Sequence, residues 1–175
     1  MLPKKQVKRP KIPQEALASL QRLCARAERS SGDALRLMAT WEVESSKRRE
    51  VLDRLIQDRF IDDKRYAEAF IREKTSLSAW GEYKIRTALR RKGISEEIIS
   101  HALQDINPQA NAERLRERLE RKAKNIRFDN TFQLKTKLLR YGLSLGFSME
   151  QVLGSVEQVV QNINTGKQCD DEFYF

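Results

Sequence analysis

The chain has 175 residues and carries 34 Lys and Arg against 25 Asp and Glu, a net charge of +9 at pH 7. No stretch approaches the ~18 consecutive apolar residues of a membrane span, and no apolar segment follows the charged N-terminus, so we expect neither a membrane span nor a signal peptide. With two isolated cysteines, Cys24 and Cys169, and the single histidine His101, the sequence offers neither a disulfide framework nor a metal site. We therefore expect a soluble, cytoplasmic protein with no metal and no cofactor.

The first predicted element is a basic arm over residues 1–13. Pro3, Pro10 and Pro13 interrupt a run of Lys and Arg that contains no acidic residue. Proline cannot continue a helix, and like charges repel one another, so this segment is predicted to be flexible.

Helices are predicted for the rest of the chain, because apolar residues recur there at a spacing of three and four and no run alternates with a period of two. Three helix starts stand out, with Asp62, Ser95 and Ser148 as capping residues. Gln151 completes a capping box with Ser148, and Ile94 can pack on Ile99 as a hydrophobic staple. The sequence therefore predicts an all-α protein of about nine helices.

The helices repeat with a period slightly above fifty residues. Ser95 superposes on Ser148, 53 positions later, and on Glu44, 51 positions earlier, with apolar residues falling on apolar residues almost throughout. For the first copy, a chance match between helical segments is the alternative interpretation, because Glu44 is a poor capping residue. We predict a tandem array of three three-helix repeats, elongated and curved. The predicted boundaries are 14–60, 61–107 and 108–163, followed by an acidic-aromatic tail over 164–175.

The net charge is unevenly distributed along the chain. Residues 1–11 carry +5, residues 12–83 are neutral, and residues 84–95 carry +5. Residues 96–112 then carry −3, residues 113–140 carry +6, and the remainder carries −4. The excess of positive charge after the arm therefore falls on two predicted helices, near 83–92 and 112–124.

On both helices the cations lie away from the apolar stripe, at 100° per residue. Ile85, Ala88 and Leu89 define the inner face of the first helix, and Leu115, Leu119 and Ala123 that of the second. An ordinary solvated face, balanced in part by Glu117 with Arg121 and Glu120 with Lys124, is one interpretation. A surface for a polyanion or an acidic partner is the other. The candidate binding residues are Lys84, Arg86, Arg90, Arg91, Arg114, Arg118, Arg121, Lys122, Lys124 and Arg127.

Aromatic residues leave two further alternatives open. Trp41 and Trp80 lie at predicted helix ends, where packing between repeats is favoured over stacking on nucleic-acid bases. The tail over 170–175 combines acidic and aromatic residues, which is typical of disorder, and a docking peptide for a partner is the alternative.

Motifs of catalysis are missing from the sequence. There is no G-x-x-x-x-G-K-[ST] loop, no strand followed by G-x-G-x-x-G and no H-E-x-x-H. Asp62 and Asp63 fit a helix start better than an acid–base pair, and His101 fits a surface or boundary position. We predict that the protein is not an enzyme.

Two segments carry a resemblance to a known family. Arg59-Phe60-Ile61-Asp62-Asp63-Lys64-Arg65-Tyr66-Ala67-Glu68-Ala69-Phe70 and Trp80-Gly81-x-x-Lys84-Ile85-x-x-Ala88-Leu89-Arg90-Arg91-Lys92-Gly93-Ile94 resemble the central signature of the bacterial RecX regulatory proteins. Cys24-Ala25-Arg26-Ala27-Glu28-Arg29-Ser30-Ser31 is similar to the family's first helix-to-helix turn, where a basic residue is more usual than Ala27. The resemblance covers roughly residues 15–160, and the third repeat is the most divergent.

The resemblance implies a non-enzymatic, monomeric regulator that binds in the groove of the RecA recombinase filament on DNA. It implies inhibition of the recombinase, ATPase and coprotease activities, with effects on DNA repair and the SOS response. A nonspecific DNA-binding helical-repeat protein that competes for single-stranded DNA is the alternative. The resemblance gives structural roles to the motif residues Phe60, Ile61, Asp62, Tyr66, Phe70, Gly81, Ile85, Leu89 and Gly93.

Overall fold

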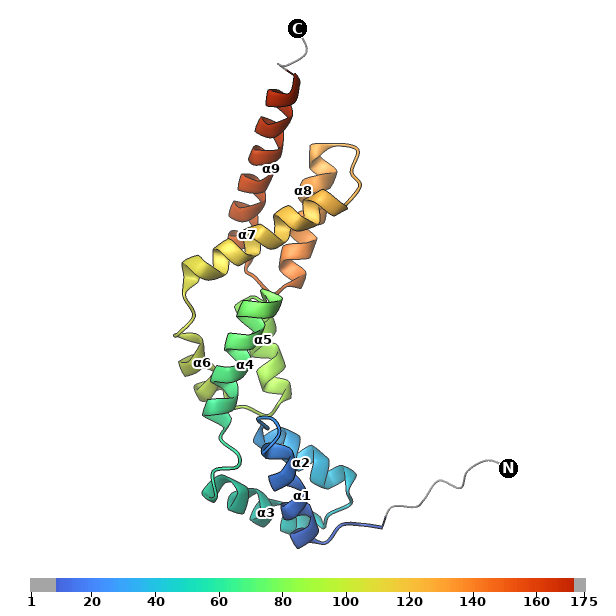
Figure 1. Cartoon of the computed structure of the whole chain (residues 1–175), viewed down its shortest axis with the longest axis vertical. Helices are drawn as coiled ribbons and strands as arrows, with labels where there is room; N and C mark the ends of the chain where they lie inside the picture. Colours follow the sequence, from blue (N-terminus) through green and yellow to red (C-terminus); the bar gives the residue numbers. More distant parts are fainter. Residues whose placement is uncertain (1–8, 172–175) are drawn as a thin grey trace, which may run out of the picture. The chain divides into compact units, whose positions relative to one another are not determined.

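The protein is helical throughout the part of the chain that its computed structural model describes, residues 9–171, with side chains described to residue 163. Most of the predicted basic arm (1–8) and the last residues of the predicted tail (172–175) lie outside this range. The prediction of an all-α fold is confirmed, and the nine helices of the described range are labelled in Figure 1. They are α1 (Pro13–Cys24), α2 (Ser31–Thr40), α3 (Ser45–Gln57), α4 (Asp63–Ser78), α5 (Glu82–Arg91), α6 (Glu96–Leu103), α7 (Pro108–Asn125), α8 (Thr131–Ser144) and α9 (Met149–Asp171).

Two element boundaries differ from the predicted ones. Pro13, the last residue of the predicted arm, begins α1, because its missing N–H group costs nothing in the first turn of a helix. At the other end, α9 continues to Asp171, beyond the predicted end of the third repeat at residue 163. No proline follows Pro108, so the sequence has no strong stop for this helix.

The chain forms two compact units, and each unit is built from two separate segments. The first unit contains the chain up to Ala69 together with Leu89–Ser100, and the second contains Phe70–Ala88 together with the chain from His101 onward. Helices α4, α5 and α6 therefore each contribute residues to both units.

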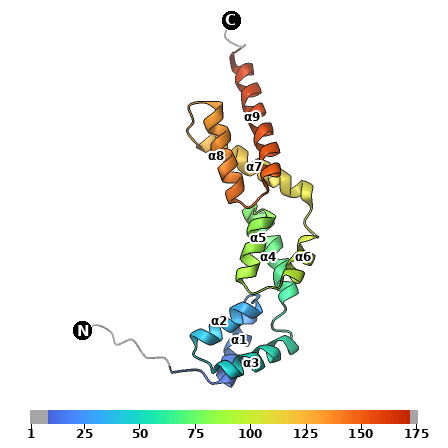
Figure 2. The same cartoon turned by 180° about the vertical axis from the view of Figure 1, so that it is seen from behind.

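An apolar cluster between α1, α2 and α3 forms the core of the first unit, and Figure 2 shows these three helices together from behind. The fully buried side chains come from apolar positions spaced at three and four residues, which is the pattern that predicts one buried helix face. The cluster consists of Ala16, Leu20, Ala34, Met38, Val43, Val51, Leu52, Leu55 and Ile61.

The core of the second unit lies between α7, α8 and α9, which pack on one another in Figure 1. The predicted inner stripe of α7 is confirmed, since Leu115 and Leu119 are fully buried. The other main members of this core are Ala123, Leu134, Leu138, Leu145, Phe147, Val152, Val156, Val159 and Val160.

Capping side chains begin the helices where the sequence predicts them. Asp62 accepts hydrogen bonds from the N–H groups of Lys64 and Arg65 at 3.0 Å. Ser148 and Gln151 form the predicted capping box, in which each side chain bonds the other residue's N–H group. Glu44 makes no capping hydrogen bond with its side chain, in agreement with its poor capping propensity.

Three equivalent turns follow the middle helices α2, α5 and α8. Glu42, Gly93 and Gly146 have φ angles of 56°, 80° and 89° and lie 51 and 53 positions apart, the spacing of the predicted repeats. A left-handed residue ends a helix and satisfies its last carbonyl groups. The residue that follows is buried in each case, and these residues are Val43, Ile94 and Phe147.

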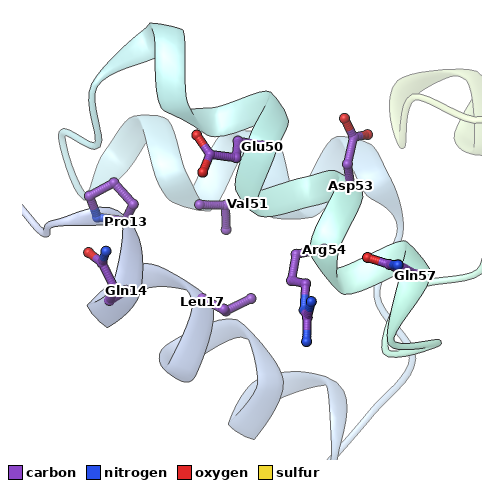
Figure 3. A pocket seen from close by; sticks show the side chains of 8 residues that line it. All are labelled: Pro13, Gln14, Leu17, Glu50, Val51, Asp53, Arg54 and Gln57. Carbon is purple, nitrogen blue, oxygen red and sulfur yellow. The ribbon is translucent and has the colours of Figure 1, made fainter.

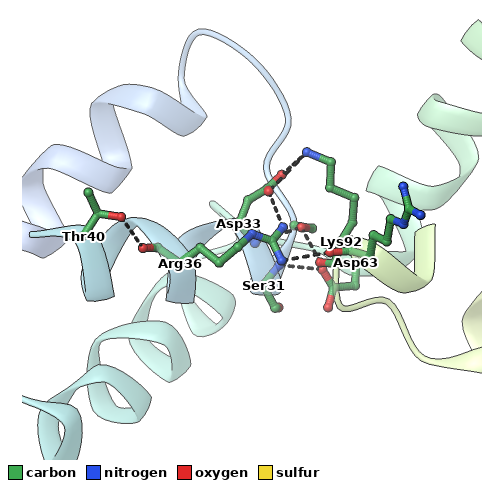
Figure 4. Close-up of polar contacts among 8 residues, drawn as sticks. Ser31, Asp33, Arg36, Thr40, Asp63 and Lys92 are labelled. Atoms are coloured by element: carbon green, nitrogen blue, oxygen red, sulfur yellow. Dashed lines mark hydrogen bonds and ion pairs between the residues drawn. The ribbon is translucent and has the colours of Figure 1, made fainter. Parts of the chain in front are cut away.

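Gly93 packs against the start of α2 in the first unit, at what we call the α2–α5 junction (Ser30–Asp33 with Arg91–Gly93). Ser30 donates to the Lys92 carbonyl at 2.8 Å, and Arg36 donates to the Arg91 carbonyl at 2.8 Å. The amine of Lys92 lies 2.9 Å from the Asp33 carboxylate. Several of these contacts are drawn in Figure 4. A Cβ atom on Gly32 would overlap the Lys92 carbonyl, so the two backbones meet only because this residue is glycine.

Ser30→Ala is expected to lower the free energy of unfolding by about 1–3 kcal/mol, because it removes a cap and takes from the Lys92 carbonyl its side-chain donor. Ser30 is fully buried and bonds both the Asp33 N–H group and that carbonyl. Ser148→Ala is the matched control, since exposed Ser148 makes only the capping bond and should cost about 1 kcal/mol. Urea unfolding curves measure both values, and equal losses would contradict the added role of Ser30.

Asp33 makes the α2–α5 junction sensitive to acid. Burial raises the pKa of its carboxyl group, but hydrogen bonds from Arg36 and Lys92 outweigh burial, and the pKa lies below its usual value. A lowered pKa contributes stability above the ordinary carboxyl pKa of about 3.9, and this contribution is lost as the pH falls toward the native-state pKa.

We expect Asp33→Asn to be less stable than the wild type at pH 7, with a difference that shrinks below about pH 4. Unfolding free energies measured at pH 7, 5 and 3 provide the check. Asp53→Asn serves as control, since exposed Asp53 pairs only with Arg49 on its own helix. A constant difference between the wild type and Asp33→Asn at all three pH values would contradict the assignment.

The second unit contains a corresponding contact, the α5–α8 junction (Gly81–Lys84 with Ser144–Gly146). The N–H groups of Gly81 and Tyr83 donate to the carbonyls of Leu145 and Gly146 at 2.8 and 3.1 Å. A Cβ atom on Gly81 would overlap the Gly146 backbone, and one on Gly146 would overlap Lys84. In both junctions, backbone carbonyls at the end of one middle helix meet the first turn of another.

Candidate polyanion-binding surface

The cations of α5 are held by partners of different kinds. The Lys84 amine donates to the Ser144 carbonyl at 3.1 Å, so this residue belongs to the α5–α8 junction. Arg86 pairs with Glu82 and Arg90 with Glu96, each at 2.8 Å. Arg91 is exposed, and its side chain makes no ion pair or hydrogen bond within residues 9–163. The four predicted residues on this helix therefore differ in how freely they can meet a ligand.

The charged residues of α7 divide between two edges of the helix. Arg114, Arg118 and Lys122 recur every four residues and therefore lie on one edge, and all three are half-buried. The acidic residues lie on the opposite edge and leave the cationic row without an acid of its own; they are Glu113, Glu117 and Glu120. Like charges at this spacing cost a few tenths of a kcal/mol per pair, so the row favours an anion lying across it.

The cationic row reaches neighbouring helices of the second unit. The Arg118 guanidinium donates to the Leu77 carbonyl at the end of α4, at 2.8 Å. The Lys122 amine lies 5.3 Å from the centre of the Tyr141 ring in α8. Because Lys84 also binds the last turn of α8, the structure brings Lys84 and Lys122 to one helix end, where the helix dipole favours cations.

One of the two predicted balancing pairs on α7 is wrong. Arg121 pairs with Glu117 at 3.7 Å, as expected, but Glu120 approaches Arg116 at 3.9 Å instead of Lys124. Both acids thus pair with arginines, whose long guanidinium groups can reach back or forward by one turn. Arg114, Lys124 and Arg127 have no ion-pair or hydrogen-bond partner for their side chains in the described part of the chain.

Cations of α8 were not singled out in the sequence, although the charge count for residues 113–140 includes them. Lys135 and Arg140 are exposed, and the Lys137 amine donates to the Arg127 carbonyl at 2.6 Å. The charge count was the available signal, since apolar spacing alone does not show which helices share a surface.

The two tryptophans contact lysines from within their own units. The Lys11 amine lies 3.7 Å from the centre of the Trp41 ring, and the Lys11 N–H group donates to the Trp41 carbonyl. Trp80 meets Phe70 edge to face, with ring centres 6.3 Å apart. The Lys84 amine lies 4.7 Å from the Trp80 ring. Cations over aromatic faces are attracted by the ring quadrupole, which fixes these lysines near the tryptophans.

The motif residues lie at helix starts, in buried positions and at the junctions. Ile85 and Leu89 are fully buried on α5, Ile61 and Tyr66 are buried around the start of α4, and Phe60 and Phe70 are half-buried. The glycines occupy the junctions described above, and Asp62 caps α4.

A hollow of about 570 Å³ lies between α1 and α3 in the first unit, and Figure 3 shows the side chains that line it. Leu17 and Val51 form its apolar part. The charged residues around it are paired, Glu50 with Lys47, Asp53 with Arg49 and Arg54 with Asp58. His101 is exposed, and no group of three His, Cys, Asp or Glu residues suited to a metal occurs among the described residues. No helix in the described range has the length and hydropathy needed to cross a membrane.

Comparison with known proteins identifies the middle of the chain. Residues 62–103 match the family model described as RecX, second three-helix domain. The regulatory protein RecX of Bacillus cytotoxicus is 30% identical over 125 residues, which are 71% of this chain and 46% of that protein. RecX of Mycolicibacterium smegmatis is 34% identical over 90 residues, 51% of this chain and 48% of that protein. The chain thus matches about half the length of these curated relatives.

A solved structure has the same fold. The crystal structure of RecX from Lactobacillus salivarius superposes with a TM-score of 0.74 at 20% identity, covering 84% of this chain and 96% of that one. The family match falls on α4, α5 and α6, the segment that carries the signature residues, and the fold agrees over most of the chain. Residues 62–103 thus match the second three-helix domain of the RecX regulatory proteins, and the chain shares the fold of a solved RecX protein.

Proposed function

We propose that this chain is a non-enzymatic, monomeric regulator that binds the RecA recombinase filament on DNA. Binding inhibits the recombinase, ATPase and coprotease activities and so affects DNA repair and the SOS response. Similarity to proteins named regulatory protein RecX supports this proposal. Because the filament forms on bacterial DNA, we place the protein in the cytoplasm.

The cationic row of α7 is the observation that carries the proposal. Arg114, Arg118 and Lys122 keep three like charges on one edge, and Arg127 follows just after the helix. A phosphate backbone that crosses this edge would relieve the repulsion between the cations and release counterions. We assign DNA or filament binding to this row and to the cations of α5 named above.

Several weak contacts on one rigid support can produce firm binding to a filament. Each exposed ion pair contributes only about 0.2–1 kcal/mol, but contacts made together act at a high effective concentration. A regulator of this kind needs no catalytic group, since it acts by occupying the filament. Binding should weaken steeply with salt, with a logarithmic slope of about −0.7 for each phosphate contacted on single-stranded DNA.

Displacement at a low ratio of protein to recombinase tests the proposal. We expect this protein to reduce the recombinase bound to fluorescent single-stranded DNA when it is far below the recombinase in concentration. Controls without recombinase measure how much of the DNA this protein covers by itself. Inhibition that appears only when the protein saturates bare DNA would contradict filament targeting.

A nonspecific DNA-binding protein that competes for single-stranded DNA is the second candidate. The partnerless cations Arg114, Lys124 and Arg127 favour it, because they require no recombinase to meet phosphate. Equal affinity for bare DNA and for the assembled filament, together with no affinity for recombinase alone, is the result that this candidate predicts.

A further inference from the structure

Two neighbouring hollows lie on the second unit, between the start of α5 and α7. One hollow of about 500 Å³ lies between the first turns of α5 and α9, and a second of about 270 Å³ lies between α7 and α9. Glu150 and Gln151 line both hollows, so the two adjoin, and we call them together the groove. The first hollow alone has the volume of an ordinary ligand site, roughly 300–1,000 Å³.

Small residues on α7 and α9 leave room in the groove for a backbone to approach. Ala112 and Gly154 line it, and a Cβ atom on Gly154 would meet no atom within 4 Å. Glycine inside a helix costs about 1 kcal/mol relative to alanine, and no close packing in this chain requires it at position 154. The open space above Gly154 is therefore available to a ligand.

Ser155 presents an unused hydrogen-bonding group to the groove. Its side chain lines the second hollow and is only 9% exposed. Within residues 9–163 its hydroxyl group has no hydrogen-bond partner. The hydroxyl group is therefore a free donor and acceptor on the wall of the hollow, and a peptide backbone carries the groups that pair with it.

The unpaired charges of the groove are negative. Glu113 and Glu150 line it and make no ion pair within the described part of the chain. The arginines that line it already have acidic partners, Arg86 with Glu82 and Arg116 with Glu120. Phosphate would be repelled here, whereas a Lys or Arg side chain would find two carboxylates. Tyr83, 74% exposed at one end, offers a ring to the stem of such a side chain.

We infer that this groove binds a peptide segment bearing a Lys or Arg residue, contributed by the recombinase itself. The inference rests on the proposed function and adds to it a protein-binding site separate from the cationic row of α7. The cationic row binds phosphate, and the groove binds the recombinase protein. The two surfaces follow from the two edges of α7, since Glu113 lies on the edge opposite Arg114, Arg118 and Lys122.

Gly154→Leu in the full chain tests the groove by filling it. Binding of DNA-free recombinase, measured by biolayer interferometry, is expected to fall at least tenfold, while affinity for a bare single-stranded oligonucleotide stays within twofold. Gly154→Ala is the matched control, because a single methyl group leaves most of the space open, and it should bind recombinase within about twofold of the wild type. Circular dichroism verifies that both variants keep the helical fold.

Removing the negative charges of the groove provides an independent test of the inference. The double variant Glu113→Gln/Glu150→Gln should weaken binding of DNA-free recombinase about fivefold or more, since each lost ion pair contributes up to about 1 kcal/mol. Glu157→Gln on α9 removes an exposed carboxylate outside the groove and should leave binding unchanged. Bare-DNA affinity should not decrease in any of these variants.

The outcomes separate the two proposals. A wild-type chain that binds neither recombinase nor filament would overturn the proposed function. A wild-type chain that binds recombinase, with Gly154→Leu and the double variant binding equally well, would overturn the groove inference alone. Loss of bare-DNA binding in the groove variants would show that the groove contacts nucleic acid and would also overturn it.

Discussion

Gly146→Ala is expected to lower the free energy of unfolding by about 2–5 kcal/mol. The left-handed φ of 89° costs alanine about 1–2 kcal/mol. Overlap of the added methyl group with the backbone and Cβ of Lys84 costs about 1–3 kcal/mol more. Because Gly146 accepts a hydrogen bond from Tyr83, the strain falls directly on the α5–α8 junction. Urea unfolding followed by circular dichroism measures the change.

Two other glycines provide the comparison. Gly81→Ala places a methyl group against the Gly146 backbone and is expected to cost about 1–3 kcal/mol. Gly154→Ala should instead stabilise the protein by about 0.5–1 kcal/mol, because Gly154 lies in a helix with open space around it. Similar stabilities for Gly146→Ala and Gly154→Ala would show that the junction contributes nothing to folding.

Reversing the partnerless cations of the α7 region is expected to weaken filament binding at least tenfold near 0.1 M salt. The variant is Arg114→Glu/Lys124→Glu/Arg127→Glu, and none of these side chains has a partner within the described residues. If each contacts one phosphate, the plot of log affinity against log salt becomes shallower by about 2, at roughly 0.7 per contact. Fluorescence anisotropy over a range of salt concentrations measures both quantities.

The control changes net charge equally at three positions outside the α7 region. Arg22→Glu/Arg26→Glu/Arg72→Glu reverses three exposed cations that lie outside the proposed surface and also have no partner among the described residues. It should leave the salt slope unchanged and reduce affinity only through the overall field. Equal loss in the two triple variants would mean that net charge, not the α7 surface, determines binding. Arg118 and Lys122 are avoided because both make contacts within the second unit.

Helix starts and core faces could be predicted from the sequence because both depend on neighbours in the chain. Asp62 and Ser148 cap helices through bonds to N–H groups two or three residues away. Leu115 and Leu119 are buried because they share one face of one helix. Such local patterns require no knowledge of which helices meet.

The junctions could not be predicted, since their acceptors are backbone carbonyls that every residue carries. The helical spacing places Lys84 on an outer face, yet its amine donates to the Ser144 carbonyl 60 residues away. The glycines at 93 and 146, separated by the repeat spacing, were the available signal. The pairing of Glu120 with Arg116 was missed for a similar reason, because the helical spacing allows partners on either side.

The turn after α2 differs from the two equivalent turns in having Glu42 where they have glycine. Glu42 occupies the same turn as Gly93 and Gly146, but it is exposed and carries a full side chain. Gly93 and Gly146 each lie against another backbone, where an added Cβ atom would be tight at Gly93 and would overlap Lys84 at Gly146. Glycine therefore occurs at this turn in the two copies where the turn forms a junction. A repeat docked on the first turn in the same way would require glycine at position 42.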